Sequence, residues 1–207
     1  MLEGFRFLSE YFPSAAQKAL VADVLAILAH NPLYTGAMPR SGKPMSVRMT
    51  NLGPLGWVSD IKGYRYQPTH PVTGHPWGPI PTALLELWDA VGDYPAPPQA
   101  CLVNWYGPDS RLGLHVDADE TADEAPVVSL SLGSRALFRL GGLRRSDPTR
   151  SMRLASGDVV VLGGRARRAY HGVDRIYPET STLIPGGGRI NLTLRRVTRP
   201  QNETPRA

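Results

Sequence analysis

Two segments in the N-terminal half of the chain, residues 14–30 and 82–92, carry apolar residues at the spacing of an α-helix. Ser14 and Thr82 stand at their starts and are expected to cap them. The apolar stripes consist of Leu20, Val24, Ile27 and Leu28 in the first segment and of Leu84, Leu85, Trp88 and Val91 in the second. The sequence therefore predicts two helices that each pack one face against a core.

Between these helices, residues 32–81 are rich in Gly and Pro and contain few residues that could build a separate core. Two short strands are expected there, at 45–50 and 63–66, joined by loops. Three aromatic side chains of this region could form either a packing nucleus or a surface for a ligand: Trp57, Tyr64 and Tyr66.

From residue 101 onward the apolar runs are short and are separated by Gly, Pro and Asp, which is typical of strands joined by turns. Residues 173–188 are expected to form a loop, and the basic segment 141–145 the tip of a hairpin. The strands are expected at 101–106, 112–116, 126–132, 136–140, 158–162 and 189–197. This spacing predicts a mainly β fold of the jelly-roll or barrel kind, flanked by helices.

The chain has 207 residues, of which 42% are hydrophobic, enough for one well-formed core and short for two. We therefore expect one domain over residues 1–198 and a frayed tail over 199–207. Cys101 is the only cysteine, so no disulfide can form within the chain. No N-terminal signal and no apolar run of membrane-spanning length is seen, which predicts a cytoplasmic protein without membrane contact.

The charge is distributed unevenly along the chain. The formal net charge is +5. Residues 1–134 have a net charge of −5, whereas residues 135–207 have a net charge of +10 and all 15 of their basic residues are Arg. Since the guanidinium fork binds phosphate well, this asymmetry favours a nucleic-acid partner.

His115 and Asp117 lie two residues apart among apolar neighbours, and His171 follows later in the chain. On a strand, that spacing places the imidazole and the carboxylate on one face. Two His and one carboxylate on one side of a metal suit iron(II), because three coordination positions stay open for substrate and oxygen. The alternative is a solvated His and Asp at a strand edge.

A second polar pattern occurs near the C-terminus, where Ile190, Leu192 and Leu194 alternate with polar residues. The polar face consists of Arg189, Asn191, Thr193 and Arg195. Asn104 and Tyr106 form a similar pair upstream of His115. Such a row could bind a dicarboxylic acid, since Arg matches a carboxylate, or it could face water on an amphipathic strand.

Six motifs occur in one order across residues 40–197: Asn104-x-Tyr106, His115-x-Asp117-x-Asp119, Pro126 to Gly133, Gly157 to Gly164, Tyr170-His-Gly172 and Arg189-x-Asn-Leu-Thr-x-Arg195. In this order and spacing they resemble the AlkB family. Its members are iron(II)- and 2-oxoglutarate-dependent dioxygenases that remove alkyl lesions from nucleic-acid bases.

The resemblance implies a double-stranded β-helix, that is, a jelly roll, with a catalytic core in residues 101–198. Residues 1–100 would supply the helices and a nucleotide-recognition lid. Iron(II) would be bound by His115, Asp117 and His171, with 2-oxoglutarate and O₂ as cosubstrates. The 2-oxoglutarate would be held by Arg189, Tyr106 and Asn191 at its distal carboxylate and by Asn104 and Arg195 at its C1 end.

The resemblance also implies contacts with the damaged nucleotide. Trp57 would stack on a flipped base, and Tyr64 and Tyr66 would line the pocket or touch phosphate. Met49 lies in the segment that matches the part gripping the nucleotide, and Asp119 would contact the exocyclic nitrogen of the base. Arg145 would reach toward substrate, its alternative being a solvated arginine in a turn.

The expected activity is the oxidative dealkylation of N-alkylated bases in DNA or RNA, single- or double-stranded, by a monomer. A dioxygenase of the same class that hydroxylates a small molecule or a protein side chain would keep the cofactor residues without needing Trp57. A jelly-roll binding module without catalysis is the third alternative. The retention of Arg189, Asn191 and Arg195 argues against it.

Overall fold

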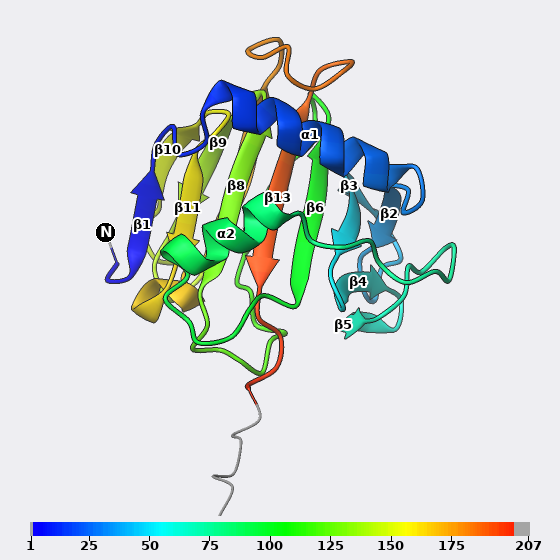
Figure 1. Ribbon diagram of the computed structural model, residues 1–207. Coiled ribbons are helices and arrows are strands. Elements are labelled where there is room, and N and C mark those ends of the chain that lie inside the picture. Colours follow the sequence, from blue (N-terminus) through cyan, green and yellow to red (C-terminus); the bar gives the residue numbers. More distant parts are fainter. Residues whose placement is uncertain (1, 201–207) are drawn as a thin grey trace, which may run out of the picture.

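The computed structural model describes residues 2–200, which form mainly β-structure with two α-helices, α1 (Ser14–Leu28) and α2 (Thr82–Val91). Figure 1 shows both helices on one face of a seven-stranded sheet. In spatial order its strands are β1 (Phe5–Leu8), β11 (Val159–Leu162), β8 (Val127–Gly133), β13 (Arg189–Arg195), β6 (Ala100–Tyr106), β3 (Pro44–Leu52) and β2 (Tyr34–Ala37).

A four-stranded sheet covers the other face of this large sheet (Figure 1). Its strands are, in order, β10 (Arg150–Leu154), β9 (Arg135–Leu140), β12 (His171–Tyr177) and β7 (Leu112–His115). A separate hairpin consists of β4 (Gly56–Asp60) and β5 (Gly63–Gln67), and η1 (Gly164–Arg168) is a short 3-10 helix. The two stacked antiparallel sheets confirm the predicted jelly roll.

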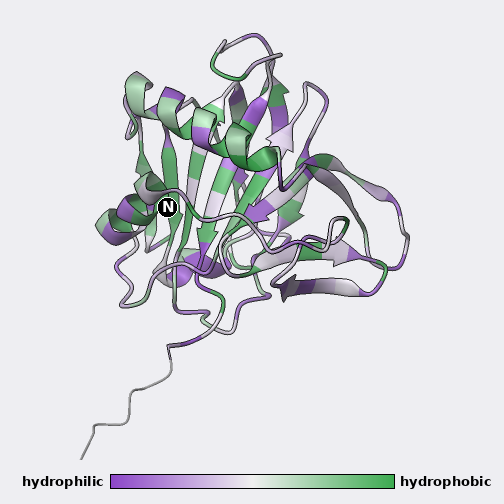
Figure 2. Ribbon diagram, turned by 45° about the vertical axis from the view of Figure 1, so that its right-hand side comes forward, coloured by the Kyte–Doolittle hydropathy of each residue, from purple (hydrophilic) through white to green (hydrophobic). Residues whose placement is uncertain are grey.

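The helices bury one face each, as predicted. They cover the apolar side of β6, β8 and β13. Figure 2 shows hydrophobic residues, in green, along the strands of the sheet under the helices. In α2 the buried stripe is Leu84, Leu87, Trp88 and Val91. Leu87 takes the place expected for Leu85, because the positions i, i+3, i+4 and i+7 share one helix face.

The predicted helix caps were wrong. Pro13 and Pro81 occupy the N-cap positions, and neither helix has a side-chain cap hydrogen bond. Each proline has an extended backbone there, which its fixed φ allows, so Ser14 and Thr82 move into the first turn. The first helix also ends earlier than predicted, at Leu28.

Most predicted strands are confirmed, and the differences have physical causes. The expected loop at 173–188 begins instead with the second half of β12, whose pairing shifts register between Val173 and Arg175. This bulge breaks the period of two by which a strand is recognised. Four further strands were not predicted. β10 is polar, and β1, β2 and β4 have only four or five residues, so none of them shows a clear alternation of apolar and polar residues.

β13 is central because it pairs with β6 on one side and β8 on the other, and all seven of its residues are buried. Its apolar residues belong to the core under the helices, so its polar residues face the small sheet. Arg189 is paired in register with Tyr106, and Asn191 with Asn104. The predicted polar row is therefore confirmed, and it faces the interior rather than water.

The β4–β5 hairpin is tied to the large sheet by a small apolar cluster that includes Met49, Val58 and Trp77. No helix within residues 2–200 is both long and apolar enough to cross a membrane. The predicted tail falls mostly on residues 201–207, which lie outside the described part of the chain.

Candidate functional site

A cavity lies between the two sheets, at the polar face of β13. The large sheet contributes the side chains of Asn104, Tyr106, Ser129, Arg189, Asn191, Thr193 and Arg195. The small sheet contributes His115 and His171 and an apolar lining that includes Leu112, Phe138 and Val173. One wall of the cavity is therefore rich in hydrogen-bonding groups, and the other is mostly apolar.

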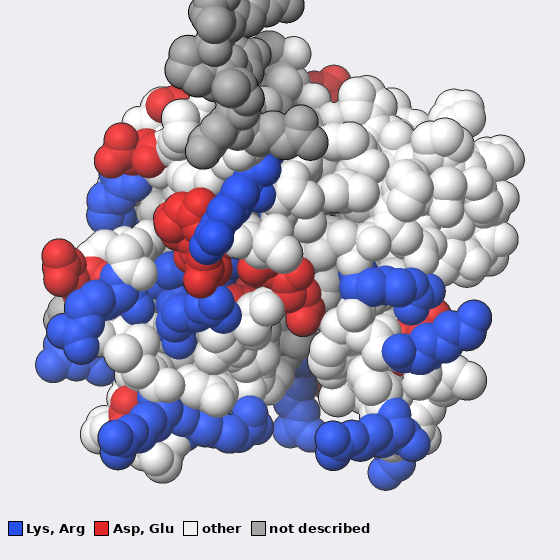
Figure 3. Space-filling view, turned by 90° about the horizontal axis from the view of Figure 1, so that it is seen from below, with Lys and Arg blue, Asp and Glu red and all other residues white. Residues whose placement is uncertain are grey.

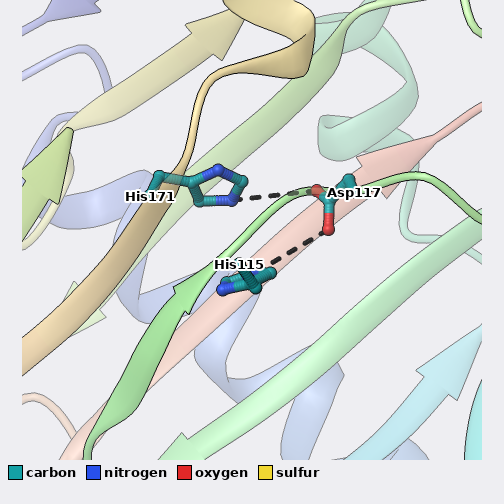
Figure 4. Close-up of side chains that lie close together, drawn as sticks. All are labelled: His115, Asp117 and His171. Carbon is teal, nitrogen blue, oxygen red and sulfur yellow. Dashed lines mark ion pairs between the residues drawn. The ribbon is translucent and has the colours of Figure 1, made fainter. Parts of the chain in front are cut away.

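His115, Asp117 and His171 converge at this cavity, and one ligand atom from each lies within 4.8 Å of the others. His115 is the last residue of β7 and His171 the first of β12, and they face each other in register. Asp117 lies beyond the end of β7, not on a strand as predicted. Its carboxylate oxygens lie 3.8 Å from His115 Nε2 and 3.9 Å from His171 Nε2 (Figure 4).

The backbone fixes the tautomer of both imidazoles. Nδ1 of His115 lies 2.9 Å from the carbonyl oxygen of Gly113, and Nδ1 of His171 lies 3.0 Å from that of Ala169. Because a carbonyl only accepts hydrogen bonds, each Nδ1 carries a proton, and Nε2 of each ring is the nitrogen that lies toward Asp117. Two such nitrogens and one carboxylate make a donor set for a divalent metal.

The electrostatics favour the protonation states that a metal needs. Burial, with a contribution from His115, lowers the pKa of His171 to about 4, so this imidazole is neutral at pH 7. Burial alone would raise the pKa of Asp117, but Arg195 and the two histidines hold that pKa well below its usual range. At neutral pH the site therefore contains the Asp117 carboxylate and, at His171, a neutral imidazole nitrogen donor.

Arg195 binds the Asp117 carboxylate with two nitrogens. Its Nη2 lies 3.0 Å from both carboxylate oxygens, and its Nε lies 3.3 Å from Oδ2. The same Nε lies 3.5 Å from a Glu120 oxygen. This side chain was expected at the C1 end of 2-oxoglutarate, and the structure places it on the candidate metal ligand.

Arg189 is 1% exposed, and some of its hydrogen-bond donors are unused in the described part of the chain. Its Nη2 donates to Ser131 Oγ at 2.9 Å, and its guanidinium lies 5.0 Å from the centre of the Tyr106 ring. Among residues 2–200, Nε and Nη1 of Arg189 have no hydrogen-bond partner. A buried unpaired cation is unfavourable, so this position is built for an anion such as a carboxylate.

Asn191 and Asn104 complete the row. The Asn191 amide donates to Ser129 Oγ and to the Leu130 carbonyl, and its oxygen accepts from Thr193. These bonds fix the orientation of Asn191 within the sheet. Asn104 is buried next to it and lines the same cavity.

The structure brings three of the expected substrate residues together. Trp57 Nε1 donates to Asp119 Oδ2 at 2.7 Å. The Tyr64 ring stacks on Trp57 with a centroid distance of 5.2 Å and an interplanar angle of 24°, and Tyr64 is 45% exposed. Asp119 is two residues from Asp117, so this aromatic pair is linked through Asp119 to the chain segment that carries a candidate metal ligand.

The other three expected substrate residues make different contacts. Met49 is buried in the apolar cluster beneath the β4–β5 hairpin. The Tyr66 hydroxyl donates to Glu120 rather than pointing to the surface. Arg145 is exposed on the β9–β10 hairpin tip and donates to the Leu114 carbonyl at 2.7 Å, beside His115.

Sequence reasoning missed two buried charged residues, Glu120 and Arg167, which form an ion pair of 2.8 Å. Three acidic residues within 117–120 were a signal for Glu120, although nothing local distinguishes it from exposed acidic residues. Arg167 lies in residues 165–168, which contain three arginines. Neither the hydrophobic periodicity nor the composition of this segment indicates which arginine is buried.

The comparisons with known proteins agree with this geometry. A family model described as the 2OG-Fe(II) oxygenase superfamily matches residues 4–195. The alpha-ketoglutarate-dependent dioxygenase AlkB homolog of Caulobacter vibrioides is 58% identical over 183 residues, which is 88% of this chain and 83% of that protein. AlkB of Escherichia coli is 40% identical over 190 residues, covering 90% and 87%.

A solved structure, that of OsALKBH1, is similar with a TM-score of 0.79 and 31% identity, covering 95% of this chain and 99% of that one. The range matched by the family model, residues 4–195, includes both sheets and every residue of the site. The chain therefore belongs to the AlkB family, and it is an iron(II)- and 2-oxoglutarate-dependent dioxygenase.

Proposed function

We propose that this enzyme removes alkyl groups oxidatively from N-alkylated bases of DNA, and of RNA, and so directly reverses alkylation damage. The observation that carries the proposal is the Trp57–Tyr64 stack, with Asp119 hydrogen-bonded to the indole. A partly exposed aromatic pair beside a metal site suits a flat base that has been turned out of its strand. A small-molecule hydroxylase would not need it.

The donor set fits iron(II), and we assign it to His115, Asp117 and His171. The unpaired nitrogens of Arg189 fit the distal carboxylate of 2-oxoglutarate, with Tyr106 and Asn191 beside them. Asn104 and Arg195 are assigned to its C1 end. When bound, iron(II) with 2-oxoglutarate and O₂ supplies the oxidation of the N-alkyl group, and 2-oxoglutarate becomes succinate and CO₂.

The residues of the chain then have distinct tasks. Arg195 keeps Asp117 ionised and oriented, and the apolar wall of the small sheet limits access of water. Trp57 and Tyr64 hold the base, while Asp119 accepts a hydrogen bond from its exocyclic amino group. Once hydroxylated, the alkyl carbon leaves as an aldehyde: its hydroxyl loses the proton as the C=O bond forms, the C–N bond breaks, and the bonding electron pair returns to the nitrogen.

Three expected residues have supporting roles in this proposal. Met49 packs beneath the hairpin that holds the base, and Tyr66 supports it from the side of Glu120. Arg145, exposed next to β7, is assigned to a phosphate of the substrate strand.

We further propose that residues 1–198 act as one catalytic domain, with the lid in 1–100 and the jelly-roll core in 101–198. A monomer in the cytoplasm is proposed, acting on single- or double-stranded substrates. The buried single cysteine, Cys101, is compatible with a reducing compartment.

Replacing Trp57 with Ala tests the nucleic-acid assignment. The loss of stacking should remove about 1–3 kcal/mol, which weakens binding of a methylated oligonucleotide about 5- to 150-fold. Decay of 2-oxoglutarate without oligonucleotide is measured on the same preparation, together with the melting temperature. A protein with a lower melting temperature, slower 2-oxoglutarate decay and unchanged oligonucleotide affinity would show that Trp57 only packs, and would contradict the proposal.

A further inference from the structure

Glu120 and Arg167 form the most deeply buried ion pair of the described chain, with side chains 2% and 3% exposed and a distance of 2.8 Å. Neither residue has a task in the assignments above. Burying two charges is costly unless their remaining hydrogen-bonding groups are satisfied, so the other partners of this pair indicate what it does.

Arg167 contacts one short segment of the chain at three points. Besides Glu120, it donates from Nη1 to the Asp117 carbonyl at 2.7 Å and from Nε to the Ala125 carbonyl at 2.9 Å. This segment lies between the end of β7 at His115 and the start of β8 at Val127, so no strand ladder holds it. Arg167 therefore supplies a hydrogen bond to the main chain of Asp117 where no strand ladder provides one.

Glu120 closes the contacts into a ring. Its Oε1 lies 3.5 Å from Arg195 Nε, and Arg195 binds the Asp117 carboxylate with two nitrogens. Arg167 thus holds the main chain of Asp117, while Arg195 holds its side chain. The two carboxylates and two guanidiniums of the ring balance each other in charge.

The β4–β5 hairpin joins this ring through one hydroxyl. Tyr66 on β5 donates to Glu120 Oε1. In the hairpin register, Tyr66 stands directly opposite Trp57, the residue assigned to stack on the base. In this cross-strand pair, Trp57 on β4 is the residue assigned to the base, and Tyr66 on β5 is the residue that contacts Glu120.

We propose that Glu120 and Arg167 are positioning residues for Asp117, and that Tyr66 couples the seating of the nucleotide to the geometry of this metal ligand. The coupling to the nucleotide rests on the proposed function, whereas the positioning of Asp117 does not. Trp57 and Tyr66 are paired across the hairpin. A base that stacks on Trp57 therefore also restrains β5, whose Tyr66 donates to Glu120.

The positioning role is tested with cobalt(II) as the probe, by titration of the purified protein without oligonucleotide. Arg167→Lys keeps the charge but cannot make three contacts in a fork, so cobalt affinity should fall about 10- to 100-fold, as for loss of an outer partner of a metal ligand. Arg168→Lys is the matched control, since Arg168 is the next residue and makes an exposed ion pair with Asp123. The cobalt(II) affinity of Arg168→Lys should equal that of the wild type.

The double variant Glu120→Gln and Arg167→Met provides a second measurement that leaves no buried charge of the pair unpaired. It should fold, as judged by its melting transition, and still bind cobalt(II) at least tenfold more weakly. Wild-type cobalt affinity in both Arg167→Lys and the double variant would overturn the positioning role.

The coupling role is tested with Tyr66→Phe, using the ratio of succinate to aldehyde formed on a methylated oligonucleotide. This ratio and the KM for the oligonucleotide should both rise severalfold. Tyr94→Phe is the control, because Tyr94 also donates to a glutamate, Glu124, at 3.1 Å but outside the site. Equal values for the two variants would refute the coupling. The cobalt titration uses no oligonucleotide, so it decides the roles of Glu120 and Arg167 even if dealkylation were to fail.

Discussion

His171→Ala will lose iron(II) binding and, with it, turnover of 2-oxoglutarate, by more than ~100-fold. Loss of an outer hydrogen-bond partner of a metal ligand already costs about 10–100-fold in affinity or activity, and loss of a donor atom should exceed that. The imidazole is buried, neutral and held by the Ala169 carbonyl with Nε2 toward Asp117, so its removal takes away one of the three donor atoms.

The measurement is an anaerobic iron(II) titration, with 2-oxoglutarate turnover assayed on the same preparation. His30→Ala is the control, because His30 is exposed near the end of α1. Its circular dichroism spectrum and that of His171→Ala should both match the wild type. Full iron affinity in His171→Ala would remove this residue from the metal site.

Arg189→Met will bind 2-oxoglutarate more than ~100-fold more weakly, yet will melt at a higher temperature than the wild type when both are free of ligand. The first effect follows because each hydrogen bond to a charged group contributes about 1.5–3 kcal/mol, and a carboxylate would accept at least two from Arg189. The second follows because Nε and Nη1 are buried without partners in the described chain. Removing such a group relieves about 1–3 kcal/mol, or about 2–4 °C for each kcal/mol.

Arg189→Lys separates charge from geometry. A point charge cannot reproduce the fork, so affinity should still fall by about tenfold or more. Arg135→Met, on the exposed start of β9, should change neither 2-oxoglutarate affinity nor melting temperature by much. If Arg189→Met bound 2-oxoglutarate like the wild type, the distal carboxylate would have to lie elsewhere, with Arg195 as the next candidate.

The polar row of β13 could be predicted from sequence because a strand's side chains alternate with a period of two. Arg189 and Asn191 fall on one face wherever the strand lies, and three apolar residues define the other. Sequence alone left open whether that face meets water or a partner. The answer came from β7 and β12, which cover it from the small sheet.

Asp117 shows where local pattern fails. A two-residue spacing from His115 places both on one face only if the strand continues, and β7 ends at His115. The carboxylate still reaches the site because Arg167 and Arg195 hold it there. Those contacts join residues 50 and 78 positions apart, a range at which no periodicity in the sequence gives information.

The same limit explains the rest of the site. Trp57 and Asp119 are 62 residues apart, and their hydrogen bond depends on how the hairpin docks. The resemblance to AlkB gave both residues a contact with the same base, whereas the residues alone favoured a packing nucleus for Trp57. Tyr66 and Glu120 could not be paired by either route, since their contact is a feature of three-dimensional packing.

Mass spectrometry of a methylated oligonucleotide before and after reaction tests the central claim most directly. With iron(II), 2-oxoglutarate and O₂, the oligonucleotide should lose the mass of one CH₂ group, and aldehyde and succinate should form in equal amounts. A panel of N-methylated bases in DNA and RNA, each with its unmethylated counterpart, identifies the lesion. If succinate forms but every oligonucleotide keeps its mass, while a small molecule or a peptide gains one oxygen atom, then the enzyme is an oxygenase of another substrate class.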